Sequence, residues 1–156
     1  MKSFFDVKGR EWELNVNCDS LMRVQNKADM DLTLLISNPT GADKNPMEIF
    51  NQLSSPVRLC QVCYALCFDQ LQKRGITPSD FGESFTGETI DNAMTALCEE
   101  LVSFSPPSKR AYLNRLIAVS RGILTKFIDL MEEEILASEK AFENAVHGTT
   151  SGSSPE

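Results

Sequence analysis

The chain has 156 residues, of which 42% are hydrophobic and 24% are charged, and its formal net charge at pH 7 is −7. These values are typical of one globular domain and exclude an intrinsically disordered chain. No apolar run approaches the roughly 20 residues of a membrane span, and the negative charge argues against general affinity for nucleic acid. Because we also find no signal peptide, we expect a cytoplasmic protein whose five cysteines are reduced.

The first predicted element is a β-hairpin over residues 4–16, where apolar and polar residues alternate on both sides of Lys8-Gly9. A two-residue loop at that dipeptide would pair Phe5 with Trp12 and place both aromatic rings on one face. Two strands alone are only marginally stable, so this face must pack on helices.

Helical patterns follow the hairpin. We predict a helix over about 19–28, one or two turns at 31–36, and a loop over 37–45. Asn45 is expected to cap a helix that begins at Pro46. The predicted fold class is therefore mainly α, with an N-terminal β-hairpin packed on a helical bundle.

A longer helix is predicted from Pro56 to the residue before Gly75, with apolar side chains on two sides, so it would form the centre of the domain. Thr77 then begins a capping-box pattern, and Thr86 is expected to cap a helix over 87–104.

The predicted helix that begins at Pro56 contains three cysteines, Cys60, Cys63 and Cys67. A metal site would need a fourth ligand, for which Cys98 on a neighbouring helix is a conceivable candidate and Cys18 is farther off. Structural zinc usually takes its ligands from two short loops, and the cysteines of iron–sulfur clusters have other spacings. Because free cysteine is among the most buried residue types, we predict that these thiols pack in the core and that the protein holds no metal and no cofactor.

The sequence offers little catalytic chemistry. The one histidine, His147, begins a polar segment over 147–156 that we expect to be disordered. The folded part would then lack the histidine of a Ser-His-Asp or Cys-His arrangement. We find no Walker loop, GxGxxG or HExxH motif, and acidic runs such as 132–134 are typical of a solvated helix face. We therefore predict no catalytic residues and no enzyme.

The last predicted element is a long helix over 106–146, which follows a domain over 1–105 and begins at a Ser-Pro-Pro break. An apolar stripe about 100° wide continues along it, and we expect its distal half to extend beyond the domain. The alternative is a bend at Gly122 that folds this half back. We predict that the stripe binds a partner, either a second antiparallel copy or another protein, with Phe127, Met131, Ile135 and Phe142 as anchors.

The first part of this helix is basic, since no acidic residue lies between Leu101 and Ile128. One alternative function is a nucleic-acid-associated or regulatory module that acts through Lys109, Arg110, Arg115, Arg121 and Lys126. The interpretation that we favour is a solvated helix face that balances acids elsewhere, because the chain as a whole is acidic.

The order of these features resembles a group of small proteins encoded among the tail genes of phages and prophages. The resemblance is carried by VKGREWELNV at 7–16, by VCYALCFDQLQKRGITPSDFGESFTGETIDNAMTALCEELVSFSP at 62–106 and by the basic SKR at 108–110. In that group a hairpin ending in G-R-x-W precedes a Y-A-L/V-C helix, a D-x-F-G turn and a helix that ends near a Phe-Pro break. Such proteins look like tail assembly chaperones, which bind the apolar tape measure protein while the tail tube polymerises around it. The resemblance implies a non-enzymatic chaperone of the host cytoplasm whose partner is a tape measure or other tail protein.

Overall fold

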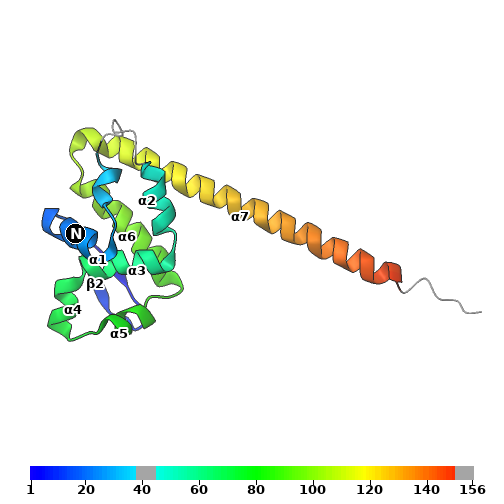
Figure 1. Cartoon of the computed structure of the whole chain (residues 1–156), viewed down its shortest axis with the longest axis horizontal. Helices are drawn as coiled ribbons and strands as arrows, with labels where there is room; N and C mark the ends of the chain where they lie inside the picture. Colours follow the sequence, from blue (N-terminus) through cyan, green and yellow to red (C-terminus); the bar gives the residue numbers. More distant parts are fainter. Residues whose placement is uncertain (38–44, 150–156) are drawn as a thin grey trace, which may run out of the picture. The chain divides into compact units, whose positions relative to one another are not determined.

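A computed structural model describes residues 1–37 and 45–149 (Figure 1). The described chain is mainly helical, with a two-stranded N-terminal sheet and a long C-terminal helix, which confirms the predicted fold class. Its residues cluster into two compact units, one from Met1 to Ile117 and one that begins at Ala118. The predicted loop over 37–45 and the predicted tail lie largely outside the described residues, at 38–44 and 150–156.

The hairpin consists of β1 (Lys2–Phe5) and β2 (Glu11–Leu14), which pair Phe4 with Trp12. The predicted pairing of Phe5 with Trp12 is wrong by one residue. The chain turns over a longer loop than Lys8-Gly9, because the backbone N–H of Asp6 donates to the carbonyl of Arg10. A slip of one residue exchanges the two faces of a strand, so Phe4 is buried and Phe5 is exposed.

Three short helices follow the hairpin. In α1 (Cys18–Ala28) the cap residue Asn17 and Ser20 form a capping box. A 3₁₀ turn, η1 (Leu32–Leu35), precedes α2 (Pro46–Leu53). As predicted, Asn45 caps α2, since its side chain accepts a hydrogen bond from the backbone N–H of Met47.

The predicted helix from Pro56 to Gly75 is divided at Cys67 into α3 (Pro56–Leu66) and α4 (Phe68–Arg74). Cys67 leaves helical geometry, with φ −92° and ψ 9°. The break lies where the Cys67 thiol contacts the carbonyl of Glu13 in β2 at 3.6 Å, a tertiary contact that no local pattern encodes. Gly75 ends α4 in the left-handed region, as predicted.

The predicted cap residue is correct for the next helix and wrong for the one after it. Thr77 caps α5 (Pro78–Glu83) by accepting from the backbone N–H of Asp80. Thr86 is not the cap of α6 (Glu88–Phe104), because Gly87, with φ 57°, occupies that position. The long helix α7 (Pro107–Thr149) follows the Ser-Pro-Pro break, passes Gly122 without interruption and continues beyond the predicted end near 146, so His147 and Gly148 are helical.

The core of the first unit lies between the hairpin and the helices (Figure 1). Helix α1 packs along α3, and β1 packs on α6. Trp12 is fully buried, and its ring meets Phe81 of α5 edge-on at 5.2 Å between ring centroids. Cys63 and Cys67 are fully buried in this core, as predicted, while Cys60 is half-buried against it.

Candidate protein interaction site

Helix α7 carries a large set of exposed apolar side chains. Every residue from Arg121 to Gly148 is exposed. The predicted anchors Phe127, Met131, Ile135 and Phe142 have exposed fractions of 59, 45, 54 and 72%. The other large apolar residues exposed between Ala118 and Gly148 are Val119, Ile123, Leu124, Ile128, Leu130, Leu136 and Val146.

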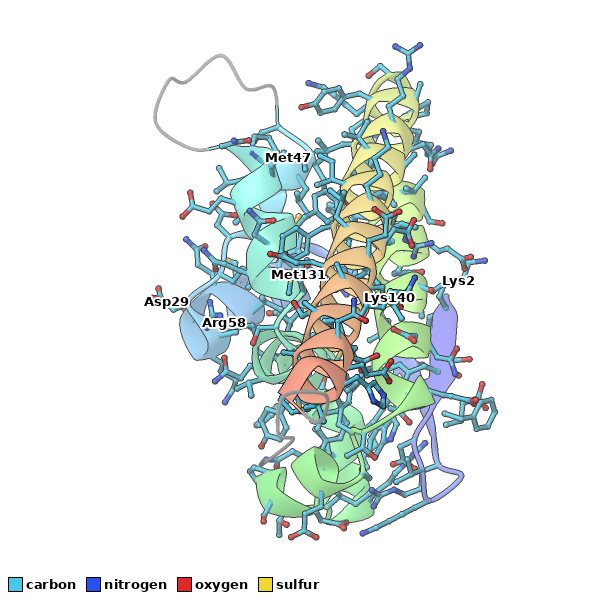
Figure 2. All side chains as sticks on the ribbon, turned by 90° about the vertical axis from the view of Figure 1, so that its right-hand side faces the viewer. Lys2, Asp29, Met47, Arg58, Met131 and Lys140 are labelled. Atoms are coloured by element: carbon cyan, nitrogen blue, oxygen red, sulfur yellow. The ribbon has the colours of Figure 1, made fainter. Side chains whose placement is uncertain are left out.

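Seven of these residues share one side of the helix. Since each residue of an α-helix turns the chain by about 100°, they fall within a band about 100° wide. Met131 lies in this band and Lys140 on the opposite side of the helix, and both are labelled in Figure 2. We call the band the α7 stripe: Leu124, Phe127, Ile128, Met131, Ile135, Phe142 and Val146.

Between Leu124 and Val146 the same band also contains one polar side chain, that of Ser138, whose hydroxyl donates to the carbonyl of Glu134 at 2.9 Å. Its polar atom is therefore satisfied within the helix, and a partner could cover it without leaving an unpaired hydroxyl. About half of each stripe side chain is exposed. Covering that half would contribute about 1 kcal/mol per side chain before the losses of association are subtracted. The stripe can thus bind an apolar partner along its whole length.

The predicted basic residues do not gather on one face. Lys109 is half-buried, whereas the other four are exposed. Arg110 donates from Nε to the carbonyl of Ser105 and from Nη2 to that of Ser103, at 3.1 and 3.2 Å, and so closes the C-terminal end of α6.

Around the helix axis, Arg110 and Arg121 share one side, while Arg115 and Lys126 lie about 140° away. A rod-like polyanion, such as a nucleic acid duplex, would therefore contact only some of these five basic side chains at one time.

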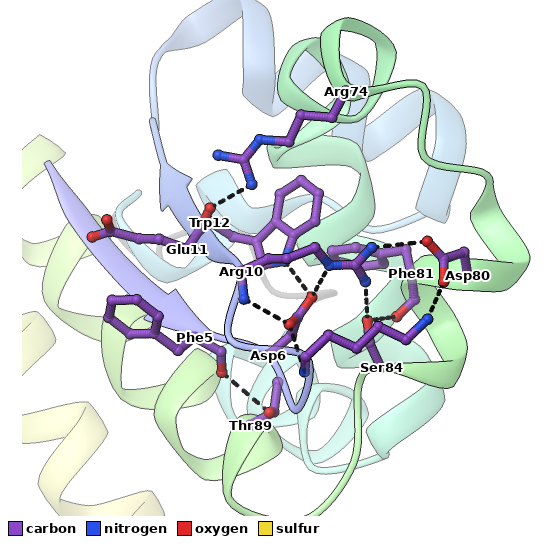
Figure 3. A network of polar contacts seen from close by, with 11 residues as sticks. Phe5, Asp6, Arg10, Glu11, Trp12, Arg74, Asp80, Phe81, Ser84 and Thr89 are labelled. Atoms are coloured by element: carbon purple, nitrogen blue, oxygen red, sulfur yellow. Dashed lines mark hydrogen bonds and ion pairs between the residues drawn. The ribbon is translucent and has the colours of Figure 1, made fainter.

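Polar and charged side chains form a cluster at the hairpin loop (Figure 3). The side chain of Asp6 is only 1% exposed. Its Oδ1 accepts from the backbone N–H groups of Lys8 and Arg10 at 2.9 and 3.0 Å. Its Oδ2 accepts from Arg10 Nε at 2.7 Å and from Trp12 Nε1 at 2.9 Å.

Arg10 joins this loop to α5. It donates from Nη1 to Asp80 at 2.8 Å and from Nη2 to the hydroxyl of Ser84 at 2.9 Å. Lys8 pairs with the same Asp80 carboxylate. None of the predicted elements indicated this cluster, although its signal is visible in the sequence as an acid four residues before an arginine and six before a tryptophan.

The pKa values of the two carboxyls are those of a cluster that stabilises the fold. Burial raises the pKa of Asp6, but hydrogen bonds from Trp12 and Arg10 and the charge of Arg10 outweigh it, so the pKa lies below its usual value. Hydrogen bonds from Lys8 and Arg10 likewise lower the pKa of Asp80. A general acid or base works best with a pKa near the operating pH, and both carboxyls move away from that range.

The buried thiols are poor nucleophiles. Burial raises the pKa of Cys60 to about 11, and it raises that of Cys67 to about 12 in spite of the nearby charge of Arg74. Reactive cysteines have a lowered pKa. Within residues 1–37 and 45–149, no group of three or more His, Cys, Asp or Glu side chains is arranged to hold a metal ion. In the same described part of the chain, no helix has the length and apolarity needed to cross a membrane.

The α7 stripe therefore presents exposed apolar side chains, whereas the buried polar cluster around Asp6 serves the fold of the first unit. Comparisons of the chain with models of protein families, with curated proteins and with solved structures find no match.

Proposed function

We propose that the protein is a non-enzymatic tail assembly chaperone that binds an apolar segment of a tape measure protein, or of another phage tail protein, through the α7 stripe. The observation that carries this proposal is the continuous exposure of Leu124, Phe127, Met131, Ile135 and Phe142 along one side of a single helix. A monomeric soluble protein rarely leaves so long an apolar surface uncovered unless it binds something there.

The geometry suits an extended partner. Amphipathic helices commonly recognise partners through apolar anchors spaced three or four residues apart. The stripe has this spacing from Leu124 to Ile135 and again from Phe142 to Val146, over a total length of about 33 Å. A long apolar helix is the kind of chain that such a surface covers best. The resemblance of residues 7–16 and 62–110 to tail-region proteins supplies the class of partner.

The rest of the molecule supports a binding role. The net charge of −7 favours solubility of a complex that contains an apolar chain. The first unit, held by its core and by the cluster around Asp6, provides a stable base from which α7 begins. The raised thiol pKa values and the lowered carboxyl pKa values are those of structural groups.

The proposal is tested by co-expression with the tape measure protein encoded in the same genome. We expect the wild-type chain to raise the soluble fraction of that protein, and the double variant Phe127→Asp/Ile135→Asp to lose this effect. The double variant Met22→Asp/Val57→Asp is the matched control, because Met22 and Val57 are 57 and 66% exposed in α1 and α3 and the two substitutions add the same two negative charges to the first unit. An unchanged soluble fraction with the wild-type chain would contradict the proposal. Retention of the protein on DNA that weakens steeply with salt would instead favour the basic residues of α7.

A further inference from the structure

The apolar and charged residues of α7 repeat with the same period. Leu124, Ile135 and Val146 are each eleven residues apart, and so are Met131 and Phe142. An eleven-residue period corresponds to about 3.67 residues per turn, close to that of a straight helix. The stripe therefore runs nearly parallel to the helix axis, and a second straight helix can contact it throughout.

One edge of the stripe carries charges with this same spacing. Arg110, Arg121, Glu132 and Glu143 are each eleven residues apart and lie about 100° around the helix from Met131. The sign changes from positive to negative between Arg121 and Glu132. On the other edge, the corresponding positions near the centre are the apolar Val119 and Leu130.

The whole helix shows the same division of charge. Up to Ile128, α7 has five basic residues and no acidic residue. From Asp129 to Thr149 it has six acidic residues and one lysine. This order opposes the helix dipole, which favours acids near the N-terminus and bases near the C-terminus. Isolated helices gain little stability from propensity alone, and a partner that sets an acidic half against the basic half of α7 would compensate for this arrangement.

We propose that this partner, in the absence of a tail protein, is a second copy of the chain, whose α7 stripe packs on the first in an antiparallel pair. A two-fold axis perpendicular to the helices brings the charged edge of each helix against the same edge of the other. In a parallel pair the charged edge would instead face the apolar edge with Val119 and Leu130. Only the antiparallel pair therefore sets the basic half of this edge against the acidic half of the partner's edge.

A single register satisfies both pairs of charges. When Arg121 lies opposite the partner's Glu132, Arg110 lies opposite the partner's Glu143, and symmetry repeats each pair. The same register places Phe127 beside the partner's Phe127, near the two-fold axis. Arg110 donates to the carbonyls of Ser103 and Ser105 at the end of α6, so a change there would also disturb the first unit; the test therefore changes Arg121 and Glu132.

The self-pairing itself does not depend on the chaperone function. Its role does rest on the proposed function: the second copy would cover the stripe until a tail protein displaces it. A chaperone that exposed the stripe continuously would be prone to aggregation, and a weak dimer covers the stripe while remaining easy to displace.

The test is sedimentation equilibrium of the purified full chain and of two charge-reversal variants, Arg121→Glu and Glu132→Arg, with circular dichroism to confirm folding. We expect the wild-type chain to dimerise at about 100 µM or below. Each single variant sets two pairs of like charges together, so its dimer should be weaker by about tenfold. The double variant R121E/E132R, and an equimolar mixture of the two single variants, should recover the wild-type affinity.

Several results would overturn the inference. A wild-type chain that stays monomeric at about 100 µM removes the self-pairing. Single variants that dimerise as tightly as the wild-type chain remove the predicted register, and so does a mixture that is no tighter than either variant alone. These results leave the chaperone function open, because a monomeric chain that still keeps the tail protein soluble retains that function without the second copy. Conversely, a dimer with the predicted charge dependence and no effect on the tail protein supports the pairing and contradicts the chaperone function.

Discussion

Replacing Asp6 with Ala should destabilise the first unit strongly, although Asp6 lies in a loop. Its carboxylate accepts four hydrogen bonds, two of them from the backbone of the loop itself. The variant leaves the Nε1–H of Trp12 without its acceptor in a side chain that is fully buried. It also removes one of the two carboxylates that surround Arg10.

The expected magnitude follows from these contacts. Removing one member of a buried, hydrogen-bonded ion pair costs about 3–5 kcal/mol. Arg10 is 21% exposed and keeps Asp80 and Ser84, so we expect the lower end, about 3 kcal/mol. For a unit of this size that corresponds to a fall in melting temperature of roughly 10 °C.

Trp12 is the only tryptophan of the chain, so its fluorescence reports the unfolding of this unit in urea. Asp80→Ala is the matched comparison, since it removes the other carboxylate at Arg10 from a more exposed position, and its effect should be smaller. An Asp6→Ala chain with a free energy of unfolding within about 0.5 kcal/mol of the wild type would refute this account of the cluster.

The effect should also depend on pH in a defined direction. The pKa of Asp6 in the folded protein lies below its usual value of 3.8, so the folded state keeps this carboxylate ionised where the unfolded state binds a proton. Its contribution is fully present above about pH 4 and is lost as the pH falls through the folded pKa. The difference in unfolding free energy between wild type and Asp6→Ala should therefore be constant near neutral pH and shrink below about pH 4.

Three further predictions test other parts of the structure. Phe4→Ala should lower the free energy of unfolding by about 3–5 kcal/mol, because Phe4 is buried, while the exposed Phe5 can be changed to Ala at a cost of no more than about 1 kcal/mol. Equal losses of the two variants in urea unfolding would contradict the hairpin register. Gly122→Ala should stabilise α7 by about 0.5–1 kcal/mol, since an added Cβ meets no atom within 4 Å, and a lower helical signal or melting temperature by circular dichroism would argue against a continuous helix there. Titration of the native protein with a thiol reagent should modify the exposed Cys18 first and reach Cys63 and Cys67 only on unfolding, and rapid reaction of all thiols would show that the core is open.

The sequence was sufficient for features that depend on local chemistry. The caps at Asn45 and Thr77, the helix ends at Gly75 and at the Ser-Pro-Pro break, and the fold class all follow from residue types at defined positions. The burial of Cys63 and Cys67 follows from helical spacing and from the small apolar character of cysteine.

Features that depend on distant residues could not be predicted in the same way. The register of the hairpin is set by the Asp6 loop, whose Arg10 is held by Asp80 and Ser84, about 70 residues later in the chain. The interruption at Cys67 coincides with a contact to β2, and Asp80 binds Lys8 and Arg10 in addition to its place in the α5 cap.

The α7 stripe has a different status, because periodicity predicted which residues share a side but not whether anything covers them. The same pattern occurs in a helix that is buried in a core and in a helix whose apolar side binds another molecule. The exposed fractions of Phe127, Met131, Ile135 and Phe142 distinguish these cases for the chain by itself.

Hydrogen exchange of the full chain, with and without the tape measure protein, is the most direct measurement of the central claim that the α7 stripe binds a tail protein. In the free chain at high dilution, amides between Leu124 and Val146 should exchange faster than those of α3 and α6, because each of these stripe residues is exposed and fraying helices open locally. In the complex, protection should rise over 124–146 and change little within the first unit. Protection that appears only in the first unit, with 124–146 still exchanging as in the free chain, would contradict the claim.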